Sequence, residues 1–129
     1  MLTAAMLATA LLFGGMVLYS FGFAAFLFNA LPAGIAGPTI RRAFPLFYLF
    51  VIGTAVIAGL LLYPADPLAS GLMLVIAATT LPTRQLLMPA INRATDAGAK
   101  PKFKMLNGLS VVITLLHIGI AGFVLSRFA

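Results

Sequence analysis

The stretch that decides the fold reads MLNGLSVVITLLHIGIAGFVLS and covers residues 105–126. Its 22 residues include no formally charged side chain. At about 1.5 Å per residue, a helix of this length crosses the hydrocarbon core of a bilayer, which is about 30 Å thick. The stretch therefore predicts a transmembrane helix over residues 105–128.

Three similar apolar stretches precede it and predict helices over residues 2–31, 43–63 and 68–91. Apolar residues make up 63% of the 129 residues and charged residues only 8%, whereas soluble domains carry about a quarter charged residues. A soluble fold of this size could not bury so much apolar surface. We therefore expect an all-α integral membrane protein with one domain over residues 1–129, a bundle of four transmembrane helices.

Proline and glycine mark the expected ends of these helices. The cluster Pro32, Gly34, Gly37 and Pro38 predicts the end of the first helix, because such a cluster does not continue one. A turn rich in proline separates the second helix from the third, and Pro82 predicts a kink within the third. The first segment lacks a basic leader and exceeds the about 7 to 15 apolar residues of a signal peptide, so we expect it to be retained.

Positive charge gathers in two loops that lie an even number of membrane crossings apart. By the positive-inside rule both basic loops belong in the cytoplasm and both termini outside, with Arg127 as the one exception. The net charge of +6 then reflects topology, and no nucleic-acid partner is expected. We expect the partner to be the lipid bilayer of a bacterial inner (cytoplasmic) membrane. Six cations are expected to meet its anionic headgroups: Arg41, Arg42, Arg93, Lys100, Lys102 and Lys104.

Polar side chains follow one face of the last predicted helix. Asn107, Ser110, Thr114 and His117 fall within an arc about 80° wide at 100° per residue, so we expect this face to look into the bundle. His117 would lie near the bilayer midplane, where it could donate a hydrogen bond, carry a proton or ligate haem iron. The simplest interpretation is a neutral imidazole that is hydrogen-bonded to a neighbouring helix. A haem with two histidine ligands would need its second ligand from another chain.

Arg84 is the second polar feature, and two interpretations stay open. Its long side chain could reach the headgroups, or it could face the interior near Asn107 and Ser110 and bind carbonyl groups or an anion. Small residues predict close contacts between helices, within the bundle or with another subunit, at five glycines: Gly14, Gly15, Gly22, Gly119 and Gly122.

Catalytic and metal-binding groups are scarce in this sequence. The chain has one His, no Cys and no Glu, so no metal site, no cofactor and no self-sufficient enzyme are expected. The exceptions would be haem or another pigment at His117, or a membrane oxidoreductase whose partner supplies a haem ligand. Scattered methionines could offer soft thioether ligands, but in apolar helices they more often fill gaps in the packing.

Five short motifs together carry a family resemblance over nearly the whole chain. They are FGGM at 13–16, F-x-x-L-P at 28–32, FPLFY at 44–48, MP-x-IN at 88–92 and F-x-x-L-x-GLSV at 103–111. In this order they resemble a bacterial domain-of-unknown-function family related to eukaryotic transmembrane protein 205. The resemblance implies a four-helix membrane protein, and the eukaryotic relatives are linked to export of, or tolerance to, platinum and other soft-metal compounds. This chain departs from the pattern at Asn107, where the family tends to have His.

Three functions remain open at this stage. The chain could be a small non-enzymatic membrane protein that handles a small solute or a soft metal, an accessory subunit of a larger membrane complex, or a protein that binds haem or a pigment through His117. A transporter should have a wet cavity that reaches the polar face. An accessory subunit should instead bury faces of small residues against a partner.

Overall fold

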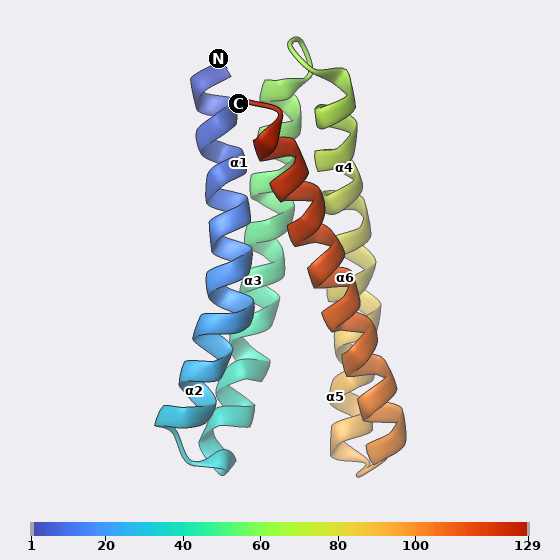
Figure 1. Cartoon of the computed structure of the whole chain (residues 1–129). Coiled ribbons are helices and arrows are strands. Elements are labelled where there is room, and N and C mark those ends of the chain that lie inside the picture. Colours follow the sequence, from blue (N-terminus) through green and yellow to red (C-terminus); the bar gives the residue numbers. More distant parts are fainter. Residues whose placement is uncertain (1, 129) are drawn as a thin grey trace.

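The computed structural model describes residues 2–128, apart from the side chains at 2, 24, 28, 33, 36 and 37, and all of its regular elements are helices. The helices form long rods, and Figure 1 shows both termini at the same end of the bundle. The elements are α1 (Leu2–Val17), η1 (Leu18–Phe23), α2 (Ala24–Ala30), α3 (Ala33–Leu62), α4 (Pro67–Pro82), η2 (Thr83–Leu87), α5 (Met88–Asp96) and α6 (Lys100–Ser126). Here η denotes a π-helix. The first rod combines α1, η1 and α2, and the third combines α4, η2 and α5.

Four helical spans within the described residues are long and apolar enough to cross a membrane. They run over Thr3–Leu27, Pro38–Leu62, Pro67–Asp96 and Lys100–Ser126. The predicted all-helical architecture with four such helices is therefore confirmed. The last two spans extend further toward their shared loop than the sequence predicted.

The second rod begins at Ala33, ten residues before the predicted start at residue 43. Between the first and second rods, the helical conformation is interrupted only at Leu31 and Pro32. Leu31 is extended because the residue before a proline avoids the helical region. The expectation that the cluster through Pro38 interrupts the helix is wrong, because Pro38 and Pro45 both lie inside α3.

The first and third rods each contain one π-helical segment. In the third rod the predicted irregularity at Pro82 is η2, after which α5 continues to Asp96. Pro82 lacks an N–H to donate, and the Thr83 hydroxyl donates to the carbonyl of Thr79 at 2.9 Å. The π-helix η1 has no proline, and the sequence did not predict it. Such segments change the register of the side chains that follow them.

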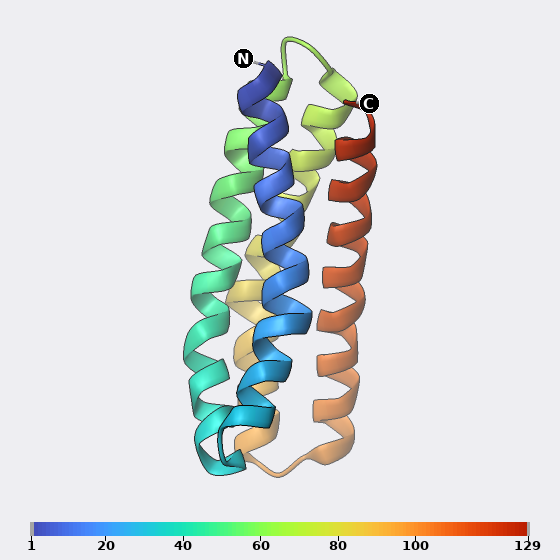
Figure 2. The same cartoon turned by 60° about the vertical axis from the view of Figure 1, so that its left-hand side comes forward.

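The rods pack around a common core in which each of the first and third rods contacts both α3 and α6 (Figure 2). Small and medium side chains dominate this core, so the helices approach closely. Its fully buried members include Ala5, Leu12, Met16, Ala55, Leu62, Met73, Ile76, Ala121 and Val124. The bundle thus has an apolar centre along much of its length.

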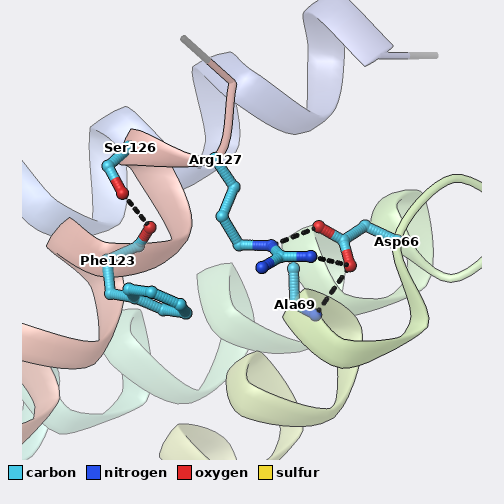
Figure 3. A network of polar contacts seen from close by, with 5 residues as sticks. All are labelled: Asp66, Ala69, Phe123, Ser126 and Arg127. Carbon is cyan, nitrogen blue, oxygen red and sulfur yellow. Dashed lines mark hydrogen bonds and ion pairs between the residues drawn. The ribbon is translucent and has the colours of Figure 1, made fainter.

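One ion pair joins elements at each end of the bundle. At the end with the termini, Arg127 donates through Nε to Asp66 Oδ2 at 2.6 Å and through Nη2 to Oδ1 at 3.1 Å (Figure 3). Asp66 also caps α4 by accepting from the N–H of Ala69. At the other end, Arg41 Nη2 lies 3.1 Å from Asp96 Oδ1. We call this second end the basic end, because the six cations expected at the headgroups are there.

Candidate functional site: a buried histidine and an aromatic groove

His117 lies on α6 with only 7% of its surface exposed, and it faces α4. Its Nε2 is 2.7 Å from the Thr79 hydroxyl, and its Nδ1 is 3.5 Å from the Thr80 hydroxyl. The Thr79 hydroxyl also lies 2.7 Å from the Val75 carbonyl, so His117 joins a hydrogen-bond network that continues along α4. Nε2 of His117 is therefore hydrogen-bonded inside the bundle.

The other members of the polar face on α6 are placed differently. Asn107 is exposed, whereas Ser110 and Thr114 are half-buried. Ser110 donates within its own helix to the carbonyl of Asn107 at 2.8 Å. Asn107 and His117 lie at opposite edges of the arc about 80° wide, and of the four side chains only His117 is buried. The structure thus does not bring these four side chains together.

Arg84 binds α3 and not the polar face of α6. Its Nε donates to the carbonyl oxygen of Pro45 at 3.1 Å, and its Nη1 donates to Gln85 Oε1 at 3.3 Å. The side chain is half-buried. The sequence left open whether Arg84 reaches the headgroups or binds carbonyl groups in the interior. The structure shows a bond to a carbonyl group, but on α3, a helix that the sequence did not indicate.

Tyr19 of η1 makes a matching contact from the opposite side of α3. Its hydroxyl donates to the carbonyl oxygen of Ala43 at 2.8 Å, two residues from the carbonyl that Arg84 binds. Its ring stacks on Phe47 with the centroids 4.6 Å apart and the planes 11° apart. Tyr19 was not identified as a site residue from the sequence. Its aromatic, hydroxyl-bearing side chain within an apolar helix was the only local feature that could have indicated a contact with another helix.

A groove lies between the first rod and α3, next to Tyr19. Its volume is about 740 Å³, and it is lined by Gly15, Leu18, Tyr19, Gly22, Phe23, Phe26, Leu46, Phe47 and Phe50. The rim residues Leu18, Phe26 and Leu46 are 70%, 64% and 67% exposed, so the groove opens on the outer surface of the bundle. In a membrane this surface faces lipid. Sequence reasoning did not indicate the groove, because it depends on how η1 sits against α3.

The five predicted packing glycines fall into two groups. A Cβ on Gly15 would lie 2.7 Å from Phe50 Cε1, and a Cβ on Gly122 would lie 3.0 Å from Phe13 Cε1. These two glycines permit close contacts between rods. Gly14 and Gly119 have nothing within 4 Å of such a Cβ, and Gly22 meets only Leu18 of its own rod, at 3.2 Å.

Metal-ligating side chains are dispersed in the described part of the chain. No three His, Cys, Asp or Glu side chains come together there in a group that could hold a metal ion. Among the methionines, Met16 and Met73 lie in the core, while Met6 and Met105 are 38% and 66% exposed. A second, smaller pocket lies beside Asp66, and His117 lines neither it nor the groove.

Comparison with known proteins gives one match. The family model described as "Domain of unknown function (DUF4149)" matches residues 7–100. No curated protein and no solved structure matches the chain. The matched region contains the whole groove lining, Thr79 and Arg84, and it ends before His117.

Proposed function

The chain belongs to the DUF4149 family, an uncharacterised domain family, and on this premise we propose that it is a non-enzymatic membrane protein that binds a small hydrophobic molecule. The molecule would enter the groove sideways from the bilayer. This is a specific form of the small-solute handling that the sequence suggested. We further propose a bacterial inner membrane as its location, with the basic end in the cytoplasm.

The groove is the observation that carries this proposal. Small-molecule sites typically measure about 300 to 1,000 Å³ and are lined mainly by apolar and aromatic side chains. The groove has about 740 Å³, and all nine of its lining residues are glycine, leucine or aromatic residues. Gly15 and Gly22 leave space in the groove, because each lacks a side chain that would fill it. A molecule that leaves the bilayer and binds there replaces its contacts with lipid chains by contacts with the aromatic rings of the groove.

The polar side chains inside the bundle favour binding at the groove over transport of a polar solute through the bundle. The buried hydroxyl groups of Thr9, Ser70 and Thr80 donate to carbonyl oxygens at 2.8, 2.7 and 2.6 Å. Nε2 of His117 is likewise hydrogen-bonded to the Thr79 hydroxyl. Among the described residues one buried side-chain polar atom, Ser20 Oγ, has no hydrogen-bond partner, so the bundle offers few free groups to a polar solute that would pass through it.

The resemblance to the transmembrane protein 205 relatives adds a soft-metal version of the same function. In that version the solute is an uncharged, apolar metal compound, because the groove offers aromatic rings and few polar atoms. Its recognition would then depend on shape and dispersion, and not on ligation by this chain.

An accessory-subunit role is the second candidate, and a separate observation favours it. Gly14 on α1 and Gly119 on α6 have open space where a Cβ would lie, so a helix of another protein could approach both closely. Gentle detergent purification distinguishes this candidate, because a stoichiometric membrane partner should co-migrate with the wild type and be lost when both glycines are replaced by leucine. Migration of the chain alone would contradict it.

Photolabelling in vesicles tests the groove directly. We expect a long-chain hydrocarbon that carries a diazirine to label residues 15–26 and 46–50 saturably, so that excess unlabelled hydrocarbon suppresses the labelling. Leu46→Trp should reduce this labelling, because the indole occupies the groove. Leu60→Trp is the matched control, since Leu60 is equally exposed on α3 (66% against 67%) and does not line the groove. Labelling that does not saturate, or that Leu46→Trp leaves unchanged, would contradict the proposal.

A further inference from the structure

Arg42 stands on the same face of α3 as the groove. It precedes Leu46 by four residues and Phe50 by eight, and residues at these spacings lie above one another along a helix. Leu46 and Phe50 both line the groove. Arg42 therefore marks the point where the groove wall reaches the basic end of the bundle.

The protein supplies no carboxylate side chain for Arg42. The chain contains two acidic residues, Asp66 and Asp96. Arg127 engages Asp66 through two hydrogen bonds, and Arg41 engages Asp96 at 3.1 Å. Arg42 is exposed, and neither of the two ion pairs described includes it. A cation in this position at a membrane surface attracts an external anion.

The dimensions of the groove fit one lipid chain. Its lining on the first rod runs from Gly15 to Phe26, which corresponds to about 16 Å at about 1.5 Å per residue. One leaflet contributes about half of the 30 Å hydrocarbon core, or about 15 Å. A single acyl chain that starts at the basic end would thus fill the groove as far as the middle of the bilayer.

We infer that the groove binds an acyl chain of an anionic phospholipid and that Arg42 holds the phosphate of that lipid. This inference rests on the proposed function, and it names the class of molecule bound. The aromatic rings select for a hydrocarbon chain, and Arg42 selects for a negatively charged headgroup. Zwitterionic lipids share the chain but lack the net charge, so they bind the same groove less tightly.

The absence of tryptophan from the sequence permits a clean test with the full chain. Phe26→Trp places a single fluorophore in the groove, and Leu60→Trp places one on α3 outside it. Each variant is reconstituted in mixed vesicles of phosphatidylcholine and phosphatidylglycerol, with brominated acyl chains on one lipid at a time. Because a basic residue at the surface contributes about 1 kcal/mol toward anionic lipid, we expect about a fivefold preference for phosphatidylglycerol in the Phe26→Trp variant and a ratio near one in the Leu60→Trp control.

Two further substitutions assign the preference to one arginine. Arg42→Gln in the Phe26→Trp background should bring the ratio close to one, whereas Arg93→Gln, which removes another exposed cation of the basic end, should leave it unchanged. A ratio near one with Arg42 intact, or a preference that survives Arg42→Gln, would overturn the inference. If saturable photolabelling of the groove is then still observed, the proposed function stands and only the lipid assignment fails. If that labelling is absent, the proposed function fails first.

Discussion

Tyr19 and Arg84 hold the same short segment of α3 from two sides, because each donates a side-chain hydrogen bond to a carbonyl oxygen of that segment. Tyr19 binds the carbonyl of Ala43 at 2.8 Å, and Arg84 binds the carbonyl of Pro45 at 3.1 Å. Both donors come from π-helical segments, η1 and η2. The π-helical segments of the first and third rods are thereby attached to the part of α3 that surrounds Pro45.

Removing the Tyr19 donor or the Arg84 donor should destabilise the bundle, and the cost should be larger for Arg84. We expect Tyr19→Phe to cost about 1 kcal/mol, because a neutral hydrogen bond is lost while the ring remains. Arg84→Leu should cost about 1.5 to 3 kcal/mol, because a charged donor is lost. Unfolding of the purified protein in a detergent titration measures both. Gln85→Ala is the control, and a cost for it as large as that of Arg84→Leu would contradict the assignment to the Pro45 carbonyl.

The ion pair between Arg127 and Asp66 predicts a dependence of stability on acidity. The two hydrogen bonds from Arg127 hold the pKa of the Asp66 carboxyl below its ordinary value of about 3.8. A carboxyl whose pKa is depressed in the folded protein contributes stability above the pKa of the unfolded state, and this contribution disappears as the pH falls through the folded pKa. We therefore expect the wild-type melting temperature to fall as the pH drops below about 4.

Asp66→Asn separates the charge from the helix cap. Asparagine retains an oxygen for the N–H of Ala69, so the cap of α4 is kept while the ion pair is lost. The variant should melt lower than the wild type at neutral pH and should lose this part of the acid sensitivity. Thermal scans between about pH 3 and pH 7 provide the measurement, since they bracket the ordinary pKa of a carboxyl. An unchanged acid response in Asp66→Asn would show that other groups cause it.

His117 is expected to have a structural role as the hydrogen-bond partner of Thr79. Thr79→Val leaves the buried Nε2 of His117 without a partner and should cost about 1 to 3 kcal/mol in the free energy of unfolding. Thr54→Val, which changes a hydroxyl on α3 that takes part in none of the described side-chain hydrogen bonds, is the control. The purified protein should also show no Soret band. A Soret band that disappears in His117→Ala would restore the haem interpretation.

Two neighbouring glycines should respond oppositely to alanine. At Gly15 the added Cβ would lie 2.7 Å from Phe50 Cε1, so the ring must move toward the groove, and we expect a cost of about 1 kcal/mol or more with weaker photolabelling of the groove. At Gly14 the added Cβ meets nothing within 4 Å, so alanine should be neutral or stabilise the helix by up to about 1 kcal/mol. Equal effects at the two positions would contradict the packing described for Gly15.

Parts of the site could be predicted from residue type alone. The burial cost of an imidazole in an apolar helix singled out His117. The need for close contact indicated five glycines, and the structure shows contacts between rods at two of them, Gly15 and Gly122. The partners could not be predicted in this way, because Thr79 lies 38 residues from His117 in the chain and Pro45 lies 39 residues from Arg84. Nothing in the local sequence distinguishes these threonine and proline residues from others on the same helices.

Local sequence was enough to specify four apolar helices and the gathering of six cations at one end, because the length and charge of each segment are local properties. The start of α3, the positions of the π-helices and the carbonyls that Tyr19 and Arg84 bind were settled only by tertiary packing. The aromatic groove likewise forms only when the first rod and α3 come together. These features depend on the rotation and register of one helix against another, which are set by the sum of many small packing contacts and not by any single residue.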